Sequence, residues 1–207
     1  MDAPGSTHAE PSHEAEHHSS LGVSNEKMAM WAMVGSEVLF FGALIAAYLI
    51  YVNSYADAPE INPRTIFDIP FTSVSTFILL MSSLGMVLAL AAAQRNDDRG
   101  MRTWLLATAL MGATFLAGQI YEFTVFVEEG MRLSTSPFTT SFYVLTGFHG
   151  VHVAVGILLL LTLWSRSMTG RFTHRKVDVV ENVGIYWHFV DIVWIMLFTL
   201  VYLIPAE

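Results

Sequence analysis

The sequence predicts an all-α integral membrane protein, built as a bundle of five transmembrane helices. Three observations lead to this fold class. Apolar residues make up 54% of the 207 residues and charged residues only 14%, whereas a soluble domain carries about 25% charged residues. The mean hydropathy is +0.51. The apolar residues are gathered into five long runs that short polar connections separate.

Each apolar run is long enough to cross a hydrocarbon core of about 30 Å as an α-helix that rises about 1.5 Å per residue. The second run contains no ionisable residue. Turn-forming residues such as Asn62-Pro63 and Arg95–Gly100 break the chain between runs. The expected spans are residues 30–52, 71–93, 103–127, 142–164 and 183–204, within one transmembrane domain of residues 29–207.

Residues 1–28 precede the first run and differ from it in composition. They hold five acidic residues against one cation, Lys27, and four of the eight histidines. A segment this poor in apolar residues cannot form a core, so we expect a disordered, acidic, His-rich cytoplasmic tail. The irregular spacing of its histidines does not favour a metal site.

The orientation of the bundle follows from the distribution of Lys and Arg. Eight of these residues lie on the side of the N-terminus and two on the opposite side. Because cytoplasmic loops carry the excess of cations, we expect the N-terminus in the cytoplasm and the C-terminus outside. The first group is Lys27, Arg95, Arg99, Arg102, Arg166, Arg171, Arg175 and Lys176, and the second is Arg64 and Arg132.

Two further features exclude whole classes of protein. The chain has no cysteine, which excludes a disulfide scaffold, Cys-ligated zinc, an iron–sulfur cluster and covalently attached haem of the c type. The net charge of −8 argues against a nucleic-acid partner. No metal site and no cofactor are expected in this chain.

Six ionisable residues lie inside the expected spans, where an ionised carboxylate costs about 2.5–3.5 kcal/mol. Counting from the nearer helix end places them in two layers. Glu37, His188 and Asp191 fall in the inner half of the membrane, and Glu122, His149 and His152 in the outer half. We therefore expect these side chains to face protein.

Two specific expectations follow from these layers. Glu122 should contact His149 or His152, directly or through water. Glu37 has no cation in its own helix, so we expect a buried carboxylate that is protonated part of the time and reactive towards carbodiimides.

From the residues alone, an interhelical packing network and an ion or proton pathway both remain open. A haem held by His188 with His149 or His152 is disfavoured by the difference in depth. A bundle-type carboxylate metal site needs Glu-x-x-His pairs, and the expected spans contain none.

Four motifs resemble subunit III of haem–copper terminal oxidases, in order along the chain. They are Ser36-Glu-Val-Leu-Phe-Phe41, Gly118-Gln-Ile-Tyr-Glu-Phe123, Thr146-Gly-Phe-His-Gly-Val-His-Val153 and Tyr186-Trp-His-Phe-Val-Asp-Ile-Val-Trp194. The resemblance implies a non-catalytic subunit of an enzyme that reduces oxygen to water and pumps protons. It also implies that the haems and copper reside in subunits I and II, and that this chain stabilises subunit I, its proton uptake and bound phospholipid.

The resemblance further implies a bacterial cytoplasmic membrane location, and extends the expected partners to a small subunit IV and a larger respiratory supercomplex. Glu37 falls at the position of the family's reactive membrane carboxylate. The expected polar network is Glu122, His149, His152, Glu181, His188 and Asp191. The expected lipid-cleft or packing aromatics are Tyr186, Trp187 and Trp194.

The chain departs from the longer family members, which have seven helices. The five-helix form resembles bacterial cytochrome c oxidases and bo-type quinol oxidases. We favour cytochrome c as the electron donor, with a quinol oxidase as the alternative. A free-standing ion or solute carrier is a further alternative, although such carriers usually show inverted repeats.

Overall fold

The computed structural model of the protein describes residues 25–54, 68–169 and 176–203. Within these residues the chain forms five long α-helices, each long and apolar enough to cross a membrane. The prediction of an all-α five-helix membrane bundle is confirmed. The helices are α1 (Asn25–Ser54), α3 (Ile69–Gln94), α4 (Asp98–Glu128), α5 (Pro137–Met168) and α6 (Lys176–Phe198), which continues into the π-helix η1 (Thr199–Leu203).

All five α-helices begin before the corresponding apolar runs, and polar residues cap the starts of three of them. Asp68 accepts a hydrogen bond from the Phe71 amide at the start of α3, and Asp97 accepts one from Gly100 at the start of α4. Ser136 caps α5, next to Pro137. These side chains satisfy amide groups that a helix leaves unpaired at its first turn.

The start of α1 differs from the expected domain boundary. The helix begins at Asn25, so the last four residues assigned to the tail are helical. The remainder of the expected tail, residues 1–24, lies outside the described residues, as do Arg64, Arg171 and Arg175.

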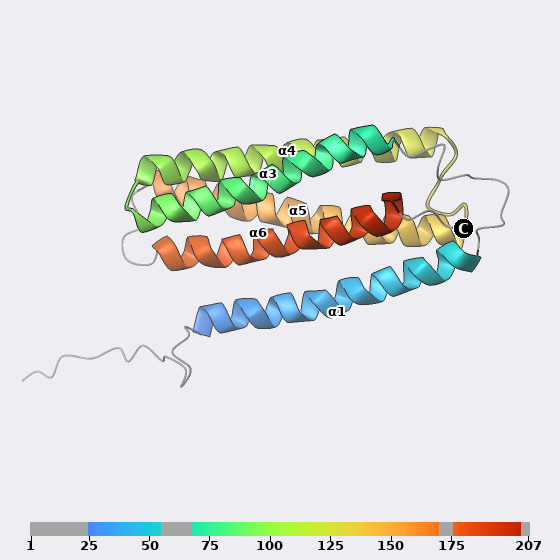
Figure 1. The fold of residues 1–207 in the computed structure, drawn as a ribbon, viewed down its shortest axis with the longest axis horizontal. Helices are drawn as coiled ribbons and strands as arrows, with labels where there is room; N and C mark the ends of the chain where they lie inside the picture. The colour runs from blue at the N-terminus through green and yellow to red at the C-terminus, as the bar shows by residue number, and fades with distance from the viewer. Residues whose placement is uncertain (1–24, 55–67, 170–175, 204–207) are drawn as a thin grey trace, which may run out of the picture.

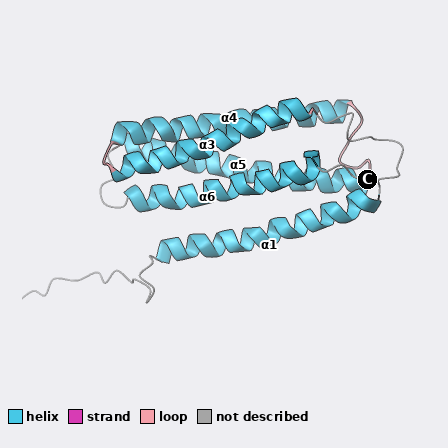
Figure 2. Ribbon diagram, in the orientation of Figure 1, coloured by secondary structure: helices cyan, strands magenta, loops and turns pink. Residues whose placement is uncertain are grey.

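The helices run alternately in opposite directions and pack as three layers (Figure 1). The pair α3 and α4 packs on the pair α5 and α6, and α1 lies outside, against α5 and α6. Figure 2 shows that the described residues outside the helices form only short loops. The start of α1, the α3–α4 turn and the end of α5 lie at one end of the bundle.

Burial differs strongly between the helices. In the apolar segment of α6 56% of the residues are buried, against 17% in α1. Helix α6 is therefore the centre of the bundle, and α1 is its most exposed helix. Large apolar side chains such as Leu39 and Ile50 point outward from α1, as expected where lipid or another chain surrounds the protein.

Candidate functional site

The first polar contact inside the bundle joins α1 to α5. Oε2 of Glu37 lies 3.3 Å from Nε2 of His152, and the two side chains are 26% and 18% exposed. Nδ1 of the same ring lies 2.7 Å from the carbonyl oxygen of Phe148. A carbonyl oxygen can only accept, so Nδ1 carries a hydrogen. The Glu37 carboxyl therefore meets the other ring nitrogen, Nε2.

This contact corrects two expectations about Glu37. The carboxyl was expected to be buried without a partner, but it is partly exposed and paired with His152. Glu37 was also placed in a different layer from His152. Because α1 begins at Asn25, Glu37 lies near the middle of that 30-residue helix, at the depth of His152 in the 32-residue α5.

The second contact joins α6 to α3 through Ser83. The Ser83 hydroxyl donates to Oδ2 of Asp191 at 2.5 Å, and Nδ1 of His188 lies 3.2 Å from the same hydroxyl oxygen. Asp191 is buried, as expected, whereas His188 is only half-buried. Oδ1 of Asp191 has no hydrogen-bond partner among the described residues.

The third contact joins α4 to α3. The Thr72 hydroxyl donates to Oε1 of the buried Glu122. Among the described residues no direct hydrogen bond joins Glu122 to His149 or His152, because the partner of Glu122 lies on α3 and His152 pairs with α1. The position of a residue along its helix gave the right end of the bundle for Glu122 but not the neighbouring helix that it faces.

His149 is fully buried and contacts two aromatic rings. Its ring stacks on Trp194 with centroids 4.8 Å apart and meets the edge of Phe115 at 5.9 Å. Neither ring nitrogen has a hydrogen-bond partner among the described residues. His149 therefore acts here as a flat aromatic side chain in the core, and not as a member of a polar pair.

The two tryptophans of α6 fill the centre of the bundle. The indole nitrogen of Trp187 donates to Ser82 at 2.9 Å, and that of Trp194 donates to Thr76 at 2.9 Å. Both rings are 1% exposed. They tie α6 to α3 and pack in the core of the bundle.

The Trp187 ring requires two glycines. A Cβ added at Gly112 on α4 would lie 2.5 Å from Cη2 of the indole, and one at Gly156 on α5 would lie 2.7 Å from Cζ3. Small residues of this kind let membrane helices approach closely. Tyr186 contributes nearby, donating its hydroxyl to the His152 carbonyl oxygen at 3.0 Å.

At one end of the bundle, Lys27 on α1 forms an ion pair with Glu181 on α6. This pair and the Glu37–His152 contact are two polar connections between α1 and the layer beneath it. The expected network is therefore several separate contacts across different helix pairs. Within the described ranges, no group of three or more His, Asp or Glu is arranged to hold a metal ion.

Sequence reasoning missed the α3 partners of these groups. Four hydroxyl residues of α3 form the hydrogen bonds described above with the acidic residues and tryptophans of α4 and α6. All four lie in the second apolar run, which contains no ionisable residue. Their spacing along one side of a helix was the available signal, but a high average hydropathy hides it. These residues are Thr72, Thr76, Ser82 and Ser83.

The comparison with known proteins agrees with this architecture. The family described as cytochrome c oxidase subunit III matches residues 8–205 of the chain. The chain belongs to the cytochrome c oxidase subunit III family. The motifs named from the sequence are thus confirmed as those of a haem–copper oxidase subunit III, and subunits of this family work within a multi-subunit terminal oxidase.

Relatives with both kinds of electron donor are similar to this chain. A cytochrome c oxidase subunit 3 from Thermostichus vulcanus is 42% identical over 82% of each chain. Another from Synechocystis sp. is 44% identical over 83% of this chain and 72% of that protein. A cytochrome bo(3) ubiquinol oxidase subunit 3 from Pseudomonas aeruginosa is 34% identical over 96% of each chain.

Proposed function

We propose that this subunit III is a non-catalytic scaffold in a proton-pumping respiratory oxidase that reduces oxygen to water. The observation that carries the proposal is the use of the intramembrane polar groups. Glu37, Glu122 and Asp191 each pair with a side chain on another helix of the same bundle. Such contacts fix helix packing in a membrane. The haems and copper that supply the redox chemistry belong to subunits I and II.

The scaffold has a defined purpose in this proposal. A rigid α3–α6 core presents fixed surfaces to subunit I, to a small subunit IV and to bound phospholipid, and it preserves proton uptake during turnover. Membership of a larger supercomplex is part of the same proposal. Glu37 is the carbodiimide-reactive carboxylate, since it lies within a membrane span and its side chain is partly exposed.

The proposed electron donor is cytochrome c. The relatives at 42% and 44% identity carry the name cytochrome c oxidase, and the ubiquinol oxidase relative is 34% identical. A subunit III of a quinol oxidase is the second candidate, because that relative covers more of the chain than the other two.

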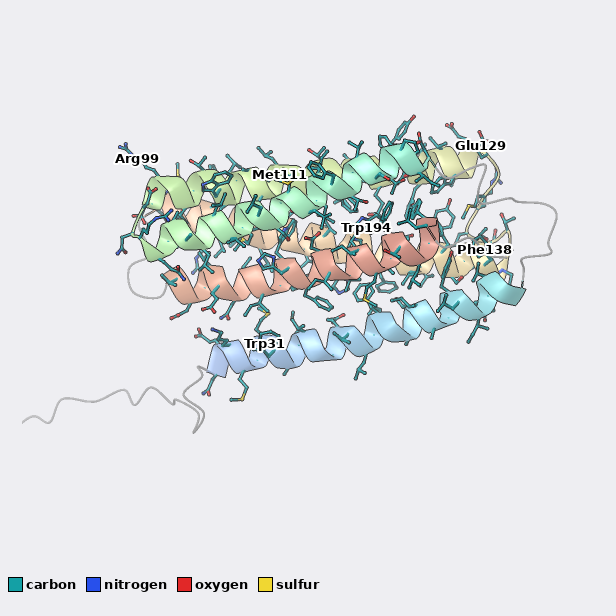
Figure 3. The ribbon with its side chains drawn as sticks, viewed as in Figure 1. Trp31, Arg99, Met111, Glu129, Phe138 and Trp194 are labelled. Carbon is teal, nitrogen blue, oxygen red and sulfur yellow. The ribbon has the colours of Figure 1, made fainter. Side chains whose placement is uncertain are left out.

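The proposed location is the cytoplasmic membrane of a bacterium, with the N-terminus in the cytoplasm. The end of the bundle that carries the start of α1 also carries Lys27, Arg99 and Arg166 (Figure 1; Figure 3 labels Arg99). Arg132 follows α4 at the opposite end. This distribution supports the positive-inside orientation.

Purification through a tag on this chain tests the proposal. We expect haem-bearing subunits to co-purify and the complex to consume oxygen with reduced cytochrome c. Oxygen consumption with a quinol but not with cytochrome c would show that the donor is wrong. A chain that purifies without any haem-bearing partner would support the free-standing carrier instead. The subunit separated from the complex should show no Soret band.

A further inference from the structure

His188 is half-buried near the middle of an expected transmembrane helix, beside exposed apolar side chains. It lies near the midpoint of the 27-residue span Val177–Leu203. No hydrogen bond from the described residues reaches its Nε2 atom, and the chain does not enclose that atom as it encloses both nitrogens of His149. His188 differs in this respect from His152, whose Nε2 is paired with Glu37.

The internal contacts of His188 define what Nε2 can bind. The Ser83 hydroxyl donates its hydrogen to Asp191, so its oxygen is left to accept from Nδ1 of His188. With its hydrogen on Nδ1, a neutral imidazole has a lone pair on Nε2. The group that His188 offers to the outside is therefore a hydrogen-bond acceptor.

The surface around this acceptor is apolar. Leu80 and Val87 lie one turn on either side of Ser83 on α3 and are 38% and 49% exposed. Ile192 and Ile195 follow His188 along the same side of α6 and are 57% and 42% exposed. We name this surface, formed by Leu80, Val87, His188, Ile192 and Ile195, the α3–α6 face.

Lipid cannot satisfy the acceptor at this depth. Acyl chains carry no hydrogen-bond donor, and the headgroups lie about 15 Å from the bilayer midplane. A polar group left unpaired in hydrocarbon costs free energy that a donor on a neighbouring helix removes. An apolar strip with one acceptor at its centre is complementary to a transmembrane helix with one donor at its centre.

We propose that the α3–α6 face docks a transmembrane helix of another oxidase subunit, whose side-chain donor binds Nε2 of His188. The proposal rests on the proposed function, since the partner is a haem-bearing subunit of the oxidase. It adds which face of this chain meets that partner and which residue lies at the centre of the contact.

Photo-crosslinking in the assembled complex tests the face. A photoreactive amino acid at Ile192 should capture another oxidase subunit, and the same probe at Leu158 on α5, which is 64% exposed, should capture phospholipid. Capture of phospholipid alone, or of a second copy of this chain, at Ile192 would overturn the proposal. Co-purification with haem would then still hold, so this failure is distinct from failure of the proposed function.

Substitutions test the acceptor. Glutamine offers an acceptor at this position and leucine does not, so His188→Leu should lower retention of the chain in the detergent-purified complex about three- to fivefold, whereas His188→Gln should stay within about twofold. Ser83→Ala removes both hydrogen bonds of that hydroxyl, to Asp191 and from His188, but leaves Nε2 of His188 in place. It is the matched control and should lower thermal stability without loss of retention. Equal retention of the leucine and glutamine variants would show that Nε2 binds no donor.

Discussion

Oε2 of Glu37 on α1 lies 3.3 Å from Nε2 of His152 on α5. The arrangement is fixed by the Phe148 carbonyl oxygen, which holds the other ring nitrogen as a donor. The pair holds the most exposed helix of the bundle to its neighbour. Because both side chains take part in a contact between two helices, we assign the pair to packing rather than to a proton pathway.

Glu37→Gln should leave proton pumping close to normal. The glutamine amide can donate to Nε2 of His152, so the α1–α5 contact persists without a group that exchanges protons. We expect an assembled complex with a near-normal proton-to-electron ratio and a loss of stability of about 1 kcal/mol or less. Proton release by the complex in vesicles measures the ratio. A fully assembled variant that has stopped pumping would place Glu37 on the proton pathway.

Gly112→Ala should destabilise the bundle by about 1–3 kcal/mol, the usual cost of overpacking a core. The added methyl group would lie 2.5 Å from the Trp187 ring. Gly42→Ala on α1 is the matched control, since nothing lies within 4 Å of its added Cβ. The thermal denaturation midpoint of the purified complex compares the two, and equal midpoints would contradict the close contact. Trp187→Phe should partly restore the stability of the Gly112→Ala variant.

His149→Phe should be neutral or should stabilise the bundle by about 1 kcal/mol. The ring contacts Trp194 and Phe115, and both nitrogens are enclosed without a hydrogen-bond partner in the part of the chain that the structure describes. Replacing unpaired buried polar atoms with an apolar group of similar shape removes their desolvation cost.

The companion variant His149→Ala should cost about 2–4 kcal/mol, because it leaves a cavity beside Trp194. Denaturation midpoints of the two variants separate the effect of shape from that of polarity. Destabilisation by phenylalanine as large as that by alanine would mean that the imidazole nitrogens have partners in the assembled oxidase.

A reporter fused after Glu207 should be active only outside the cytoplasm, and one inserted in the connection between α5 and α6 only inside it. The physical reason is the eight-to-two distribution of Lys and Arg between the two sides. Paired reporters that are active in cytoplasm and periplasm give the measurement. The reverse pattern would invert the bundle and move the proposed sites to the opposite leaflets.

The sequence by itself determined the number of helices, their order and the family. Each of these properties depends on continuous segments of the chain and not on contacts between distant segments. A run such as residues 71–93 crosses a membrane because of its own length and apolar content. The motif Tyr186–Trp194 identifies the family because it is continuous.

Only the tertiary structure decided which polar groups meet. Glu37 and His152 were placed in different layers, and Glu122 was expected to meet a histidine, yet its partner is Thr72. Depth along a helix can be counted from the sequence, with an error set by the unknown cap position. The rotation of each helix about its axis depends on how all the helices pack, and here the Trp187 ring, which fits only against Gly112 and Gly156, helps to set it.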